Sequence, residues 1–191
     1  MAATKRESIL EAARELFLRD GFAGTSMDAV TARAGVSKAT VYAHFSSKDQ
    51  LFASLMRETA RPIFDGFPPL EPGDDPGRQL RRYLAAVRAV AFTEGRTWER
   101  LAIAEAGRHP EIGRLLHEMG ETRIKAALVG FLEGKGCPEP ALAAETLLAV
   151  ALVAPLHRQL LGVEDPAFAD IEVGLGPLIR SVLRAHPPQD G

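Results

Sequence analysis

The chain has 191 residues, of which 46% are hydrophobic and 25% are charged. This composition is typical of a folded globular protein and excludes a disordered or fibrous one. The length suits one ordinary domain, or a small domain attached to a larger core. The net charge is −2, and residues 1–50 carry seven Lys/Arg against six Asp/Glu. The chain as a whole is therefore not basic, and any nucleic-acid binding must depend on the local placement of charge.

The sequence gives no sign of secretion or of membrane insertion. Cys137 is the single cysteine, so no internal disulfide can form, which fits a reducing compartment. The N-terminus is charged and lacks the apolar run of a signal peptide. The longest apolar stretch, which lies between Glu145 and His157, is shorter than the roughly 20 residues that a bilayer requires. We therefore expect a cytoplasmic protein without a membrane partner.

The first 25 residues predict one helix and the start of a second. Apolar residues recur at helical spacing over 5–19, where Gly21 should end the helix and Phe22 should anchor the returning chain. Thr25 to Asp28 has the pattern of a capping box before a short second helix. No segment of the chain has the two-residue period of a strand, so the fold class predicted is all-α.

Two further N-terminal helices follow closely. Gly35 should end the second helix, and Ser37 should cap a third over 38–44 that Phe45 closes. Ser46 and Ser47 offer the next cap, so a long fourth helix should begin at residues 47–48. Pro62 is expected to kink or end it.

The C-terminal part reads as a series of longer helices. A loop rich in glycine and proline is expected at 66–77, in which Asp75 and Pro76 form a good helix start. The His109-Pro110 pair should separate two helices, and residues 186–191 should be disordered. The predicted helices cover residues 76–93, 98–106, 110–133, 140–161 and 166–185.

The first 60 residues have the build of a helix-turn-helix. The turn between the second and third helices must be tight, which Gly35 allows, and Val36 then fills the angle between them. The third helix should offer a polar N-terminal end to the major groove, while Val41 and Phe45 hold it to the core. A hydroxyl such as that of Tyr42, or the N-terminus of the fourth helix, can bind a phosphate. The predicted DNA-binding residues are Thr25, Ser26, Ser37, Lys38, Ala39, Thr40, Tyr42, His44 and Lys48.

Residues 25–52, TSMDAVTARAGVSKATVYAHFSSKDQLF, resemble the DNA-binding domain of the TetR family. The resemblance implies a helix-turn-helix domain over residues 1–50 and a helical ligand-binding and dimerisation domain over 51–191, joined by the fourth helix. It also implies a homodimer that binds a palindromic operator as a repressor and is released by a small molecule. Residues 98–111 are similar to an AefR-like branch of the family, whose members often act near efflux or stress genes, with His109 where phenylalanine is more usual.

An amphipathic or apolar ligand is expected within the C-terminal body. Large adaptable side chains gather there, as they do in pockets for drug-sized molecules, although each could simply pack the core. The residues predicted to line this site are Tyr83, Arg88, Phe92, Trp98, His117, Met119, Phe131 and Arg158.

The last two predicted helices are apolar over a wide arc, which suggests that a second copy of the chain covers one face. The family resemblance places the dimer interface on these same helices. The residues that carry this prediction are Leu142, Leu147, Val150, Leu161, Phe168, Ile171, Leu175, Leu178, Ile179 and Val182.

Other kinds of site find little support. The five histidines include no pair at helical metal-binding spacing, so no metal or other cofactor is expected. No nucleophile motif surrounds Cys137, and Glu99 and Glu105 are interpreted as solvated or as partners of nearby arginines, so we predict no enzyme activity. Two alternatives stay open, an all-α enzyme or ligand carrier and a helical interaction module. Neither should bind duplex DNA with a steep salt dependence.

Overall fold

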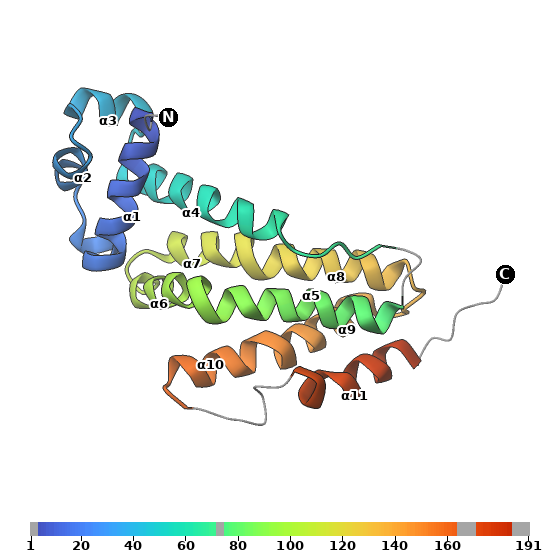
Figure 1. The fold of residues 1–191 in the computed structure, drawn as a ribbon. Coiled ribbons are helices and arrows are strands. Elements are labelled where there is room, and N and C mark those ends of the chain that lie inside the picture. The colour runs from blue at the N-terminus through green and yellow to red at the C-terminus, as the bar shows by residue number, and fades with distance from the viewer. Residues whose placement is uncertain (1–3, 72–74, 164–170, 185–191) are drawn as a thin grey trace. The chain divides into compact units, whose positions relative to one another are not determined.

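The computed structural model describes residues 4–71, 75–163 and 171–184, and all regular structure in these ranges is helical (Figure 1). The all-α prediction is therefore confirmed. The helices are α1 (Lys5–Gly24), α2 (Met27–Ala34), α3 (Lys38–His44), α4 (Lys48–Asp65), α5 (Pro76–Val90), α6 (Arg96–Glu105), α7 (Pro110–His117), α8 (Arg123–Glu133), α9 (Pro140–Leu148), α10 (Ala154–Leu160) and α11 (Ile171–Arg184).

The turns of the N-terminal helices follow the predicted chemistry. Gly21 departs from helical geometry with φ 76° and ψ 173°, and Phe22 beyond it is fully buried. Gly35 ends α2 in the left-handed conformation, with φ 65°. The Ser37 side chain accepts a hydrogen bond from the backbone N–H of Thr40 and caps α3. The Ser47 hydroxyl likewise accepts from the N–H of Gln50 at the start of α4.

One detail of this region differs from the prediction. The cap of α2 is Ser26, whose hydroxyl accepts from the N–H of Ala29, whereas Thr25 is 2% exposed and donates its hydroxyl to the carbonyl of Gly21. Thr25 is thus one residue too early to cap α2. Pro62 was predicted to kink or end α4, and it lies inside this helix, which continues to Asp65, so the kink stays a prediction.

The later helices contain π-helical turns where loops or uninterrupted α-helices were expected. The predicted break at 94–97 is a π-helical turn at Ala91–Gly95, followed directly by α6. Two further π-helical turns, Glu118–Thr122 and Ala149–Val153, connect α7 to α8 and α9 to α10. The predicted start of the last helix at residue 166 and the predicted disorder of 186–191 lie outside the described residues.

The described chain groups into two compact units, each considered by itself. The N-terminal unit comprises Met1–Phe64 and Thr97–Met119, so α6 and α7 pack with the first four helices. Its core contains three mutually packed aromatic rings, Phe17, Phe22 and Phe52, with ring centroids 5.1–5.6 Å apart. Trp98 and Ile112, from the later segment, are buried in the same core. The expected division at residue 50 concerns functional domains and stays a prediction.

The C-terminal unit comprises Asp65–Arg96 and Gly120–Gly191. Within it α5 packs against α11, and α8 packs against α9. Fully buried leucines fill its core, because each of these helices turns an apolar stripe toward the others. They are Leu80, Leu84, Leu128, Leu132 and Leu147, with Leu148 and Leu175 beside them.

The structure corrects the expectation that the longest apolar stretch is too short to cross a bilayer. Pro140–Leu160 is a continuous helical run of 21 residues that contains an 18-residue window with a mean hydropathy of 1.5, so by length and composition alone it could cross a membrane. Core helices of globular proteins meet the same two conditions, and seven of its side chains are buried within the C-terminal unit: Ala144, Leu147, Leu148, Ala151, Leu152, Pro155 and Leu156.

Candidate nucleic-acid interface

Helices α2 and α3 form a helix-turn-helix. Gly35 makes the tight turn because its positive φ carries little steric cost without a Cβ. Val36 packs against the core of the N-terminal unit, as predicted. Val41 and Phe45 are at most 1% exposed and fasten α3 to that core. One side of α3 is thereby fixed, and its other side remains at the surface.

The exposed side of α3 carries most of the predicted DNA-binding residues. Ser37, Lys38, Ala39 and His44 are exposed, Thr40 is half-buried, and Tyr42 is 43% exposed. The Ser37 and Thr40 hydroxyls lie 2.8 Å apart and share a hydrogen bond. Ser26 is also exposed, at the N-terminus of α2. A short helix with one apolar side and a polar, exposed N-terminal end can enter a major groove.

Lys38 is held by a partner that sequence reasoning missed. Its Nζ lies 2.7 Å from Oδ1 of Asp28 in the first turn of α2, and both side chains are largely exposed. The hydrogen bond and the negative charge of Asp28 raise the pKa of Lys38. The lysine is therefore protonated and, in this structure, directed toward α2. The sequence counted Asp28 only as part of a cap.

Lys48 occupies a different position from the one expected of a phosphate ligand. Its Nζ donates to the backbone carbonyls of Phe22 and Thr25, at 2.8 and 3.0 Å. The same ammonium lies 4.4 Å from the centroid of the Phe22 ring. Lys48 thus ties the start of α4 to the α1–α2 corner. Of the predicted DNA-binding residues, Thr25 and Lys48 have their polar groups engaged inside the protein.

The other basic residues of the first helices are also largely paired at the surface. Arg6 pairs with Glu58 and Arg33 with Glu15, and Arg19 forms a bidentate pair with Asp20. Such exposed pairs contribute little to stability and exchange readily for other anions. DNA phosphates could therefore replace these carboxylates at small cost to the fold.

The structure corrects the interpretation of Glu105 as a solvated residue. It ends α6, is only 7% exposed, and its Oε1 accepts a hydrogen bond of 3.2 Å from the N–H of Ala23. The ring of His109 packs edge-on against Phe22 at 4.7 Å. The α6–α7 turn is thus attached directly to the α1–α2 corner. Sequence spacing gave no signal of a contact across 82 residues.

The residues predicted to bind a ligand do not gather in one unit. Trp98 lies in the N-terminal core with its ring 6.3 Å from that of Phe52, and Met119 packs against the same core. His117 is exposed in that unit. The remaining five belong to the C-terminal unit: Tyr83, Arg88, Phe92, Phe131 and Arg158.

Within the C-terminal unit, Arg88 has a defined polar role. Its Nη1 donates to the carbonyl of Ala151, at 2.9 Å, in the π-helical turn Ala149–Val153. Its guanidinium also lies 5.0 Å from the centroid of the Phe92 ring. Burial lowers the pKa of Arg88 and raises that of Tyr83. Arg88 thus connects α5 to a π-helical turn, and such turns often occur at functional sites.

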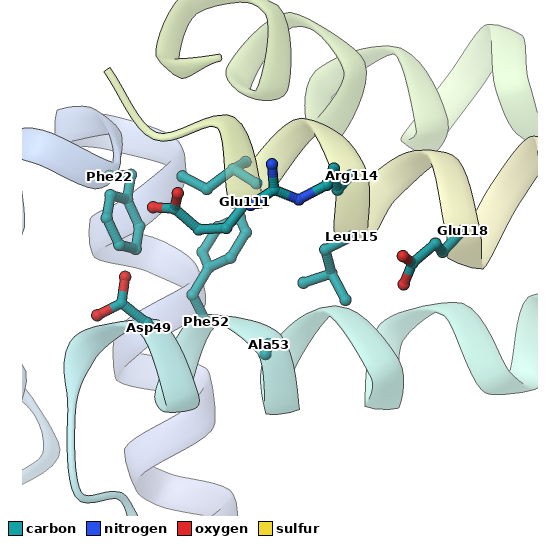
Figure 2. A pocket seen from close by; sticks show the side chains of 9 residues that line it. Phe22, Asp49, Phe52, Ala53, Glu111, Arg114, Leu115 and Glu118 are labelled. Atoms are coloured by element: carbon teal, nitrogen blue, oxygen red, sulfur yellow. The ribbon is translucent and has the colours of Figure 1, made fainter. Parts of the chain in front are cut away.

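A cavity of about 260 Å³ lies within the N-terminal unit, between α4 and α7 (Figure 2). Phe22, Phe52 and Leu115 are among the residues that line it, and none of the predicted ligand residues does. Among the residues that the structure describes, no three His, Cys, Asp or Glu side chains gather in a way that could hold a metal ion.

An exposed, polar α3 held behind a glycine turn defines a DNA-binding protein of the helix-turn-helix class. Comparison with known families agrees. Residues 9–55 match the description "Bacterial regulatory proteins, tetR family", and residues 78–174 match "AefR-like transcriptional repressor, C-terminal domain". The chain belongs to the TetR family of transcriptional regulators, with a C-terminal part of the AefR-like type.

Relatives and solved structures support the same assignment. The chain is 26% identical to the HTH-type regulator YhgD of Bacillus subtilis over 71% of its own length and 69% of that protein. The structure of a protein named "Flavonoid-responsive Regulator FrrA" is 30% identical, covers 97% of this chain and 98% of its own, and superimposes with a TM-score of 0.85. NalD of Pseudomonas aeruginosa, described as the secondary repressor of the MexAB-OprM multidrug efflux pump, is 25% identical over 92% of this chain and 94% of its own, with a TM-score of 0.60.

Proposed function

We propose that this regulator is a cytoplasmic repressor that binds a palindromic operator as a homodimer and leaves it when a small amphipathic or apolar ligand binds. The observation that carries the proposal is the exposed polar side of α3, which Val41 and Phe45 fix to the core. A helix held in this way can insert its N-terminal residues into a major groove.

The proposed DNA contacts are those that the geometry leaves accessible. Lys38 and Thr40 approach base edges from the start of α3, with Ser37 and Ala39 beside them. Tyr42 and His44 reach the backbone from farther along the helix. Ser26 can present its exposed hydroxyl to a phosphate at the N-terminus of α2. Thr25 and Lys48 act indirectly, since they hold the α1–α2 corner in place.

The test of DNA binding is to recover and sequence DNA fragments that the purified protein retains, and then to measure affinity for the recovered site over a range of salt. A regulator should select one palindromic site and lose affinity steeply as salt rises, because phosphate contacts release counterions. A helical enzyme, ligand carrier or interaction module would retain no preferred sequence.

Repression is favoured by the names of relatives, though not by all of them. AcnR of Corynebacterium diphtheriae is described as a repressor and is 38% identical over 29% of this chain and 30% of its own length. FasR of Mycolicibacterium smegmatis is described as an activator and is 37% identical over 32% of this chain and 28% of its own length. Deleting the gene and measuring transcripts beside the recovered operator separates the two. Transcripts rise if the protein represses and fall if it activates.

Release by a ligand is supported by the name of the flavonoid-responsive neighbour and by the buried Tyr83 and half-buried Arg88 of α5. Ligand binding would favour a spacing of the two DNA-binding domains of the dimer that no longer matches successive major grooves. By linkage, operator DNA must then weaken ligand binding by the same factor. Titrating apolar compounds with and without operator tests this, and equal affinity in both cases would contradict the sensing role.

A further inference from the structure

The cavity between α4 and α7 has an apolar floor. Phe22 and Phe52 contribute two aromatic rings, 5.3 Å apart in an edge-to-face arrangement, and Ile112 and Leu115 contribute aliphatic groups from α7. With about 260 Å³ of space, it can accept a single aromatic ring with a short chain. Every lining residue belongs to the N-terminal unit, so the cavity is a property of that unit alone.

Acidic side chains surround this floor. Asp49 stands in the first turn of α4, Glu111 lies on α7, and Glu118 follows α7 (Figure 2). The figure shows the Asp49 and Glu111 carboxylates near Phe22, with Glu118 toward the other end of the cavity. Arg114 is the one cationic side chain among the lining residues. The rim therefore carries an excess of negative charge.

The three carboxylates differ in whether a neighbouring group of the protein offsets their negative charge. Glu111 lies 3.1 Å from Nδ1 of His109, and its own backbone N–H, together with His109, lowers the pKa of this carboxyl. Asp49 and Glu118 form no ion pair with any residue in the part of the chain that the structure describes. These two charges are thus available to a bound cation at opposite ends of an apolar floor.

We propose that this cavity binds a small organic cation with an aromatic or aliphatic body. The body would lie on Phe52, Ile112 and Leu115, and the positive group would lie at one end of this floor, beside Asp49 or beside Glu118. An anion of the same shape would be repelled, and a neutral molecule would gain only the apolar contact. This site is separate from the side of α5 considered above for the releasing ligand, and it does not depend on operator release.

The experiment uses three probes that share one body: 3-phenylpropylamine, 3-phenylpropanol and 3-phenylpropionate, which at pH 7 are cationic, neutral and anionic. Binding to the full-length protein is followed by the fluorescence of Trp98, the single tryptophan, whose ring lies 6.3 Å from Phe52. The amine should bind about 1.5-fold to fivefold more tightly than the alcohol, the range expected for exposed charge pairs. The propionate should bind least.

Substitutions test whether the preference for the amine over the alcohol arises in this cavity. Asp49→Asn with Glu118→Gln keeps the shape of the rim and should abolish the preference for the amine over the alcohol. Glu11→Gln with Glu133→Gln removes the same net charge from exposed positions elsewhere and should leave that preference intact. Ala53→Met should weaken all three probes, because Ala53 lines the cavity and a larger side chain would fill it.

The proposal fails if amine and alcohol bind equally to the unmodified protein, or if none of the probes binds. It also fails if the Asp49→Asn, Glu118→Gln protein keeps the full preference for the amine. Thermal melting of each variant shows whether it is folded. If the Ala53→Met protein is not folded, the comparison of the two charge-neutralised proteins still decides the outcome.

Discussion

At the scale of single residues, Lys38 and Lys48 show how one residue type can have two roles within a short segment. Both follow a serine cap at the start of a helix. Lys38 is exposed and meets only an exposed carboxylate, whereas Lys48 reaches backward onto two carbonyls and an aromatic ring. The difference comes from what lies next to each helix start in space.

Replacing Lys48 by methionine should lower stability more than it alters the electrostatics of DNA binding. Methionine keeps the apolar stem but removes the two hydrogen bonds that Lys48 donates, so the Phe22 carbonyl keeps only the N–H of Thr25 and the Thr25 carbonyl loses the ammonium donor. We expect a loss of about 2 kcal/mol, the scale of hydrogen bonds to a charged group. Urea unfolding measures this loss, and the slope of log affinity against log salt should stay unchanged. A slope reduced by about one, with stability intact, would instead make Lys48 a phosphate ligand.

Asp28→Asn should increase affinity for DNA. The substitution releases Lys38 and removes a negative charge that lies beside it, so the lysine can meet the DNA without first giving up a partner. We expect severalfold tighter binding and a salt slope that is steeper by up to about one. Glu11→Gln, which removes an exposed carboxylate on α1, serves as the control. Unchanged or weaker binding would show that Asp28 positions Lys38 for the operator.

At the scale of elements, the α1–α2 corner is where α6 joins the DNA-binding helices. Gly21 leaves helical geometry there, and a Cβ placed on it would lie 3.0 Å from Oε1 of Glu105. That same oxygen accepts the Ala23 N–H. The corner therefore needs a glycine for two reasons, its backbone conformation and the close approach of a buried carboxylate.

Gly21→Ala should destabilise the protein by about 2 kcal/mol, since its φ and ψ belong to a region that only glycine occupies readily. Part of the cost should disappear in a Glu105→Ala background, where the close contact is gone, with a coupling of about 0.5–1 kcal/mol. Gly107→Ala is the matched control, because its added Cβ would meet no atom within 4 Å. Additive effects in a double-mutant cycle would show that Glu105 does not constrain the corner.

At the scale of the whole molecule, the helical stretch through α9 and α10 has two unlike sides. One side is buried within the C-terminal unit, while Leu142 and Val153 on the other are 61% and 47% exposed, followed by Leu161 at 67%. The predicted interface residues divide accordingly. Leu147, Leu175 and Ile179 are buried in the protomer, and Val150, Leu178 and Val182 are half-buried. Phe168 and the side chain of Ile171 lie outside the described residues.

If a second copy covers this exposed side, charges placed on it should separate the dimer. Leu142→Glu with Val153→Glu should give monomers in sedimentation at micromolar concentration, because burying unpaired carboxylates in an apolar interface is costly. Ile103→Glu changes a residue that is 60% exposed on α6 and should leave the dimer intact. A monomeric unmodified protein would contradict the dimer itself, and a dimeric double variant would place the interface elsewhere.

Local sequence patterns were sufficient to predict the helices of the DNA-binding domain and the family. Gly35, Ser37 and Phe45 act through local backbone geometry and capping, which depend on near neighbours in the chain. The three-dimensional structure was needed to find the partners of Lys38, Lys48 and Glu105. It was also needed to assign Trp98 to the N-terminal core and to reveal the cavity beside Phe52. These features join residues from different helices, and helical periodicity indicates which face of a helix is apolar without indicating what that face meets.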